Sequence, residues 1–293
     1  MKKILVTGVS GFIGHHFIKA AQDAGYWVKG VDKRPIPSNH YKPNLFVQAD
    51  VNDLNYRDVM GCDYVVHFAW RTNIPDCQRH PEDSTRQNID MSIHMLELAR
   101  EAGVKNFLFP STASLYGNNP TPWKEDMTPD PIEPYSWQKL SIEHASSMYT
   151  KVYGLPTTIF RFFQVFGEFQ REDTALAAFL KAKKDNKPVT LTQTTAQSSF
   201  KSGQRDFVYA GDLAEALVMA LDSENTGKGE VLNVASGTFK TMEEIAKAIG
   251  AEVEWIPKRE YEVERHLADV SKIKGVIGWE AKTDVIEWLK EHS

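Results

Sequence analysis

The chain has 293 residues, of which 42% are hydrophobic and 25% charged, and its formal net charge is −5 at pH 7. These values are ordinary for a globular protein and exclude disordered, collagen-like and coiled-coil chains. A mildly acidic chain without Lys/Arg blocks offers no nucleic-acid or membrane surface, and no run of about 18 apolar residues predicts a membrane span.

Short apolar runs alternate with amphipathic stretches through the first half of the chain. Strands that are apolar on both faces and are joined by helices indicate an α/β fold, namely a Rossmann-type doubly wound parallel sheet. Ligands of such sheets bind at the carboxyl ends of the strands. Six strands are predicted, at Ile4–Val6, Trp27–Val31, Leu45–Val47, Tyr64–Phe68, Phe107–Phe109 and Thr157–Phe160.

Beyond Gln164 the alternation loosens, which predicts a second, smaller lobe of mixed α/β structure. We assign residues 1–163 to a cofactor-binding domain, with 206–233 returning to it, and residues 164–205 and 234–293 to a substrate-binding lobe. Helices are expected at Thr174–Lys184, Asp212–Leu221, Met242–Ile249 and Asp284–Lys290.

Two local signals add detail to this second lobe. Thr241 followed by Glu244 has the spacing of a capping box, in which each residue satisfies a free amide of the other at a helix start. The polar stretch Thr192–Gln204 has the Thr, Ser and Gly content of a hairpin or loop.

A glycine triplet follows the first strand, in the segment Thr7-Gly8-Val9-Ser10-Gly11-Phe12-Ile13-Gly14. Glycine permits a tight turn and the close approach of a pyrophosphate to the amides and positive dipole of the next helix. Asp32 ends the second strand about twenty residues later, where a carboxylate accepts hydrogen bonds from ribose hydroxyls. Its charge would repel a 2′-phosphate and so favours NAD, whereas Lys33 and Arg34 would attract one.

Tyr135 and Lys139 are four residues apart on a predicted helix, Tyr135–Tyr153, so their side chains share one face. A tyrosine with a pKa near 10 is a poor base at neutral pH, and the Lys139 ammonium is expected to lower that pKa. Such a pair can also occur by chance on a helix surface. Here it is the only Tyr with a Lys at that spacing, and it follows the strand end that carries Thr112.

Together these motifs resemble the extended short-chain dehydrogenase/reductase family, specifically its NAD-dependent nucleotide-sugar epimerases and dehydratases. The resemblance spans nearly the full length. Besides the glycine loop it rests on Asp50-Val51, His67-Phe68-Ala69, Asn88, Ser111-Thr112 before Tyr116-Gly117, Pro134-Tyr135 with Lys139, Arg161 to Gly167, and Arg205-Asp206-Phe207.

The resemblance implies roles for individual residues. Tyr135 would exchange a proton with the hydroxyl being oxidised, Lys139 would bind the nicotinamide ribose, and Thr112 would hold the sugar oxygen. Asp50 would contact adenine, while Gln164, Arg205 and Arg265 would meet the substrate together with Thr112. The implied cofactor site comprises Gly8, Gly11, Phe12, Ile13, Gly14, Asp32, Asp50, Val51, Phe68, Ala69, Asn88, Tyr135 and Lys139.

The chain also departs from the family pattern. Trp70 stands where a small residue is usual, and Gln164 replaces the asparagine that generally meets the nucleotide diphosphate. Arg205 is expected to clamp that diphosphate, the alternative being a surface ion pair with Asp206. Arg265 either assists it or is a solvated charge.

Other side chains are expected to be structural. His67, at a strand end, is predicted to be packed or bonded to backbone, and the pair His15-His16 to lie at a helix surface and in packing. Cys62 and Cys77 have no metal or redox spacing, which indicates reduced thiols and a cytoplasmic protein without a metal site. An aromatic group is expected to pack the lobe boundary: Phe160, Phe162, Phe163 and Phe166.

The predicted function is that of an NAD-dependent nucleotide-sugar 4-epimerase of the UDP-hexose type, which oxidises C4 transiently. Alternatives are a 4,6-dehydratase, a ketoreductase or a decarboxylating relative, and, outside the enzymes, an NAD-binding sensor. Ala113 and Ser114 occupy positions where related dehydratases have carboxylates, which disfavours elimination. A homodimer is expected through the helices Glu82–Ala102 and Tyr135–Tyr153.

Overall fold

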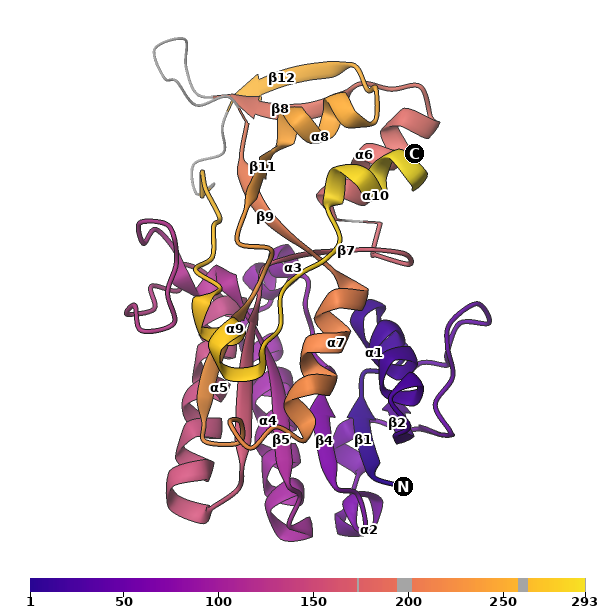
Figure 1. Ribbon diagram of the computed structural model, residues 1–293, viewed down its shortest axis with the longest axis vertical. Helices are drawn as coiled ribbons and strands as arrows, with labels where there is room; N and C mark the ends of the chain where they lie inside the picture. Colours follow the sequence, from indigo (N-terminus) through magenta and orange to yellow (C-terminus); the bar gives the residue numbers. More distant parts are fainter. Residues whose placement is uncertain (173, 194–201, 258–262, 293) are drawn as a thin grey trace.

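The computed structural model describes residues 1–172, 174–193, 202–257 and 263–292. Seven parallel strands form the main sheet, in the order β10-β6-β5-β4-β1-β2-β3, with a smaller layered body above their carboxyl ends (Figure 1). The strands are β1 (Lys3–Thr7), β2 (Trp27–Asp32), β3 (Leu45–Gln48), β4 (Tyr64–His67), β5 (Asn106–Thr112), β6 (Thr157–Phe162) and β10 (Glu230–Val234).

All six predicted strands are confirmed, each within two or three residues of its expected bounds. The strand order reverses between β1 and β4, because β2 and β3 continue on one side of β1 and β4, β5 and β6 on the other. A crevice at the carboxyl ends of β1 and β4 is therefore the expected ligand site of this sheet.

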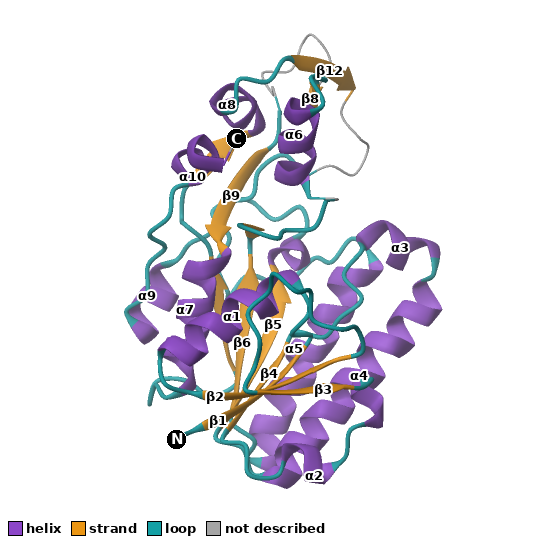
Figure 2. Cartoon of the chain, turned by 90° about the vertical axis from the view of Figure 1, so that its right-hand side faces the viewer, coloured by secondary structure: helices purple, strands orange, loops and turns teal. Residues whose placement is uncertain are grey.

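Helices cover both faces of the main sheet (Figure 2). Successive residues of β1 alternate between the two resulting cores, as the pleat requires: Ile4 packs in the core that contains Phe17, and Leu5 in the core that contains Met95. One face carries α1 (Phe12–Asp23), α7 (Ala210–Leu221) and α9 (Ser271–Ile277); the other carries α2 (Tyr56–Val59), α4 (Pro81–Ala102) and α5 (Pro134–Tyr153).

Above the sheet lies the second body, which is also visible in Figure 2. Its strands are β7 (Gln164–Phe166), β9 (Gln204–Tyr209) and β11 (Phe239–Thr241) in one sheet, and β8 (Val189–Gln193) with β12 (Val253–Pro257) in another. Its helices are α6 (Ala175–Lys184), α8 (Met242–Ala248) and α10 (Val285–His292). The short helices α3 (Ile74–Arg79), η1 (Val51–Asp53) and η2 (Ala113–Tyr116) follow strands of the main sheet.

The helices expected in the second half of the chain are confirmed, and so is the capping box: Thr241 Oγ1 accepts from Glu244 N at 3.0 Å while the Glu244 carboxylate accepts from Thr241 N at 2.7 Å. Most of the predicted loop Thr192–Gln204 lies outside the described residues. The aromatic group expected at one boundary is instead divided among three cores, with Phe160 and Phe162 in one, Phe163 in another and Phe166 in a third.

The division into lobes at residues 163, 205 and 233 stays a prediction. The elements on which it rests are distributed between the two bodies: β9 belongs to the smaller sheets, whereas α7 and β10 belong to the main sheet and its cover. Within the described part of the chain, no helix combines the length and the apolar character needed to cross a bilayer.

Candidate active site

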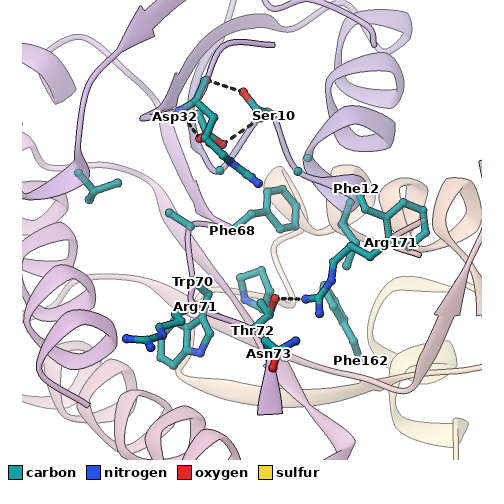
Figure 3. A pocket seen from close by; sticks show the side chains of 18 of the residues that line it. Ser10, Phe12, Asp32, Phe68, Trp70, Arg71, Thr72, Asn73, Phe162 and Arg171 are labelled. Carbon is teal, nitrogen blue, oxygen red and sulfur yellow. Dashed lines mark hydrogen bonds and ion pairs between the residues drawn. The ribbon is translucent and has the colours of Figure 1, made fainter. Parts of the chain in front are cut away.

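A cavity of about 870 Å³ opens at the carboxyl ends of β1, β2, β4 and β5 (Figure 3). Its volume is at the upper end of the range typical of small-molecule sites. The structure brings most of the predicted residues to this one cavity: Gly8, Gly11, Phe12, Ile13, Gly14, Asp32, Asp50, Val51, Phe68, Ala69, Thr112, Tyr135 and Lys139 line it.

Gly8 and Gly14 of the glycine loop are required for different steric reasons. Gly8 has φ +75°, and a Cβ there would lie 2.6 Å from Ala69 N, so the loop packs on the segment after β4. A Cβ on Gly14 would lie 2.5 Å from Gly8 O, which fixes the close contact between the loop and α1.

Gly11 is the N-cap of α1, and no side chain caps the helix or adds an acidic group to its first turn. The first amides of the helix therefore face the cavity together with the positive end of the helix dipole, an arrangement that fits the pyrophosphate of a dinucleotide.

Asp32 is nearly buried at the end of β2, where backbone amides fix its carboxylate (Figure 3). Oδ2 accepts from Ser10 N at 3.1 Å and Oδ1 accepts from Arg34 N at 2.9 Å. Arg34 Nε also lies 3.5 Å from Oδ1, a long and weak contact, so the carboxylate is still placed to receive the ribose diol of an adenosine.

We expect the wild-type protein to bind NAD more tightly than NADP, and Asp32→Ala to weaken NAD binding about tenfold or more, because two charge-assisted hydrogen bonds are lost. Isothermal titration of both cofactors into each protein measures this. Tighter binding of NADP by the wild-type protein would contradict the prediction and shift the recognition to Lys33 and Arg34, which also line the cavity.

The start of α5 holds the Tyr/Lys pair in place. Glu133 caps the helix by accepting from Tyr135 N at 2.7 Å and from Ser136 N at 2.9 Å. One turn later, Lys139 is buried and its Nζ donates to Pro110 O at 2.6 Å, at the end of β5. Both side chains thus meet the cavity from the same helix face, next to Thr112.

The electrostatics of the pair differ from the expectation. Burial raises the pKa of Tyr135 to about 12, while hydrogen bonding with Thr112 and the charge of Arg171 oppose that rise. The predicted lowering by Lys139 is therefore wrong: its ammonium is directed at the Pro110 carbonyl, and Arg171 is a cation whose charge acts on the phenol. Burial also lowers the pKa of Lys139 well below its usual range, which the Glu143 carboxylate opposes.

Glu143 belongs to a buried charged network behind Lys139. Its carboxylate accepts from Arg161 Nε at 3.1 Å and Arg161 Nη2 at 2.8 Å, and it also accepts from Ser111 Oγ. Glu143 and Arg161 are 3% exposed each, so neither charge is solvated by water. The network joins α5 to β5 and β6 directly beneath the Tyr/Lys pair.

Four predicted site residues are not among the described residues that line this cavity. Asn88 is buried behind its wall, where it accepts from Arg71 N at 2.8 Å and donates to Gln138 Oε1 at 2.8 Å. Gln164 pairs with Phe207 between β7 and β9. Asn88 thus supports the cavity wall from behind, and the role of Gln164 toward a substrate remains a prediction.

Arg205 and Arg265 converge on β9. Arg205 Nη1 donates to Gln204 O at 2.9 Å and to Glu264 O at 3.2 Å, and Arg265 Nε donates to Gln204 Oε1. The neighbouring Asp206 is buried and accepts from Ser236 N at 2.8 Å, so its carboxylate is directed into the protein and the alternative of a surface pair is not supported. A role of either arginine toward a diphosphate remains a prediction.

The histidines are packed more deeply than expected. His67 is confirmed as a packed residue, 2.8 Å from Thr7 Oγ1 and 3.1 Å from Ser92 Oγ. His15 and His16 were expected partly at the surface but are buried, because residues from elsewhere cover this end of α1. The His15 ring lies 4.3 Å from His40 and 4.9 Å from Phe169, centroid to centroid.

Several residues that line the cavity escaped the sequence analysis, among them Arg71 and Arg171. Both lie in irregular segments that follow strands, and Figure 3 shows Arg171 reaching from the smaller body to Thr72, whose hydroxyl accepts from it. No periodicity marks such positions. Their only signal is that they follow strand ends, which is where ligands bind in this fold.

Comparison with known proteins agrees with this geometry. Residues 4–235 match the NAD dependent epimerase/dehydratase family. The chain is 28% identical to the UDP-glucuronate 4-epimerase of Thermodesulfobacterium geofontis, over 98% of this chain and 93% of that protein. It is 29% identical to the UDP-glucose 4-epimerase of Corynebacterium glutamicum, over 94% and 90% of the two chains.

A solved structure, that of UDP-glucuronic acid 4-epimerase from Bacillus cereus in complex with UDP-glucuronic acid and NAD, matches with a TM-score of 0.86 at 26% identity. The match covers 98% of this chain and 96% of that one. The Rossmann-type fold and the family resemblance expected from the sequence are both confirmed. This chain belongs to the NAD dependent epimerase/dehydratase family.

Proposed function

We propose that the protein is an NAD-dependent 4-epimerase of UDP-sugars. Tyr135 takes the proton of the C4 hydroxyl in its phenolate form, which the charge of Arg171 favours. Thr112 holds the same oxygen by a hydrogen bond, and Lys139 binds the nicotinamide ribose. When NAD is bound, its nicotinamide supplies the chemistry that the chain lacks, by accepting a hydride from C4 and returning it. The protein contributes orientation and proton transfer, and it must let the oxidised sugar turn over before the hydride returns.

One observation carries the choice of epimerase over dehydratase. Of the described residues that line the cavity, the acidic ones are Asp32, the last residue of β2, and Asp50, which follows β3. A dehydratase needs an acid and a base beside the threonine to remove water after oxidation. At that place the chain has Ala113 and Ser114, which cannot exchange protons effectively near neutral pH.

The test is to incubate the purified protein with UDP-glucose, UDP-N-acetylglucosamine and UDP-glucuronate, and to examine the products by NMR and mass spectrometry. The expected product is the C4 epimer, with unchanged mass and no accumulation of NADH. A product about 18 Da lighter, the mass of one water, would show that the enzyme catalyses elimination and not epimerisation. Net formation of NADH would indicate a dehydrogenase instead.

A second candidate, a UDP-hexuronate 4-epimerase, is favoured by Arg171. The arginine lines the cavity, and its charge acts on Tyr135, so a guanidinium lies on the side of the pocket where C4 reacts. A carboxylate at C6, two carbons from C4, would meet that guanidinium in a charge-assisted hydrogen bond. On this proposal kcat/KM is higher for UDP-glucuronate than for UDP-glucose, and Arg171→Ala removes most of the difference.

We also propose a homodimer, supported by the outer face of α5. Trp137, Met148 and Val152 are 50%, 40% and 63% exposed and recur along one face of the helix, which leaves apolar surface for a second copy. A two-fold interface would pair this face and α4 with their copies. The free thiols of Cys62 and Cys77 support the proposed cytoplasmic location, since disulfides are rare there.

Light scattering is expected to give twice the chain mass at micromolar concentration, and Trp137→Glu is expected to shift the protein toward a monomer by burying a charge in the interface. Asp90→Ala on α4 is the control, because it changes the charge of the proposed interface without removing an apolar side chain. It should leave the protein dimeric. A monomeric wild-type protein under these conditions would end the proposal.

A further inference from the structure

Trp70 makes a contact that the proposed reaction does not use. Its side chain follows β4 and lies over Lys139, with Lys139 Nζ 3.7 Å from the centroid of the indole ring. The Phe109 ring lies on another side of the same ammonium, at 4.7 Å. The two rings are 5.7 Å apart with an interplanar angle of 61°, so they form two walls around Nζ while Pro110 O accepts its hydrogen bond at 2.6 Å.

Hydrogen bonding does not explain why Trp70 lies there. The indole Nε1 is buried without a hydrogen-bond partner among the described residues, a cost that folded proteins usually avoid. The side chain also lines the cavity, where Figure 3 shows it next to Arg71. The side chain packs against the core that contains Phe109, and its ring face contacts the Lys139 ammonium.

The physical effect of that contact is to favour the charged form of Lys139. Burial in an apolar site disfavours an ammonium, and the carboxylate of Glu143 on the next turn of α5 opposes this. An aromatic face attracts a cation most strongly where water is excluded, and indole does so better than phenyl. The rings also accept no conventional hydrogen bond, so the remaining N–H groups of Lys139 stay available to a ligand.

We propose that Trp70 is a positioning residue that keeps Lys139 charged and fixes its Nζ where the nicotinamide ribose binds. The proposal rests on the proposed function for the role of Lys139 toward that ribose. Other titratable groups that act on Lys139 are Glu143 on its own helix and His67 on β4, whose pKa burial and the charge of Lys139 lower to about 3. None of these groups is altered when Trp70 is replaced.

The test measures NAD affinity of the cofactor-free protein by isothermal titration between pH 6 and pH 10, and so needs no sugar substrate. Affinity should fall as Lys139 loses its proton. In Trp70→Leu the midpoint of that fall is expected about one pH unit lower than in the wild-type protein, the shift given by a cation–π contact in a desolvated site. Trp70→Phe keeps a ring face, and its midpoint is therefore expected to lie close to that of the wild-type protein.

The matched control is Trp255→Leu, which replaces a half-buried tryptophan on β12 and should keep the wild-type midpoint. If Trp70→Leu does not fold, Trp70→Met takes its place, since the flexible methionine side chain can fill an irregular gap without a ring. An unchanged midpoint, with or without a uniform loss of affinity, would show that Trp70 is only a wall of the pocket. Epimerase activity is scored separately, so failure of this proposal leaves the proposed function intact.

Discussion

Tyr135→Phe is expected to lose at least about a hundredfold in turnover while it keeps its affinity for NAD, because the substitution removes only the hydroxyl that exchanges the proton. The phenol lies beside Thr112 in the cavity, and its backbone is fixed by the Glu133 cap, so the ring should stay in place. Initial rates on the best UDP-sugar, with NAD affinity measured in parallel, provide the test.

Tyr149→Phe is the matched control for this variant. Tyr149 lies on the same helix and is also largely buried, but its hydroxyl donates to Glu97 at 3.2 Å, away from the cavity. Its removal should leave turnover close to that of the wild-type protein. If Tyr135→Phe is as active as this control, another group must take the proton and the proposed mechanism fails.

Glu143→Ala is expected to lower the free energy of unfolding by about 3–5 kcal/mol, because it leaves the buried guanidinium of Arg161 without its counterion. The carboxylate accepts two hydrogen bonds from Arg161 and one from Ser111, and all three groups are shielded from water. Urea denaturation of the cofactor-free protein measures the change. Activity should fall as well, because Lys139 loses the carboxylate that favours its charge.

Glu82→Ala on α4 is the control for Glu143→Ala, because it also removes one partner of an ion pair, but of an exposed one. Glu82 pairs with Arg86 at 2.8 Å one turn away, but both side chains are about three-quarters exposed, at 76% and 74%. Exposed pairs contribute little, so this variant should unfold at nearly the wild-type urea concentration. Equal destabilisation in the two variants would show that the buried network does not hold α5 on the sheet.

Local patterns predicted the parts of the site that depend on neighbours in sequence. The glycine loop and Asp32 could be recognised because a strand, a turn and a helix succeed one another within one βαβ unit. Tyr135 and Lys139 could be paired because helical geometry alone puts residues four apart on one face. In each case the structure brings to the cavity what the spacing indicates.

Features that depend on the assembled fold could not be predicted in this way. His15 and His16 are covered by residues far away in the sequence, among them His40, Phe169 and Glu168, which reach α1 from irregular segments. The raised pKa of Tyr135 follows from burial, which spacing does not report. In the same way, Arg171 reaches the cavity from the smaller body, and nothing in the sequence around it marks it as a pocket residue.

The return of the chain to the main sheet sets the order in which this protein can be completed during synthesis. Helix α7 contributes Leu213 and Leu217 to the core that also contains Ile4 and Phe17, and β10 pairs with β6 as the last strand of the sheet. A nascent chain of 163 residues therefore has the glycine loop and the Tyr/Lys pair, but on one face of its sheet it has α1 and lacks α7 and α9. The core on this face becomes complete only when Ile273 and Trp279, which pack into it, have left the ribosome.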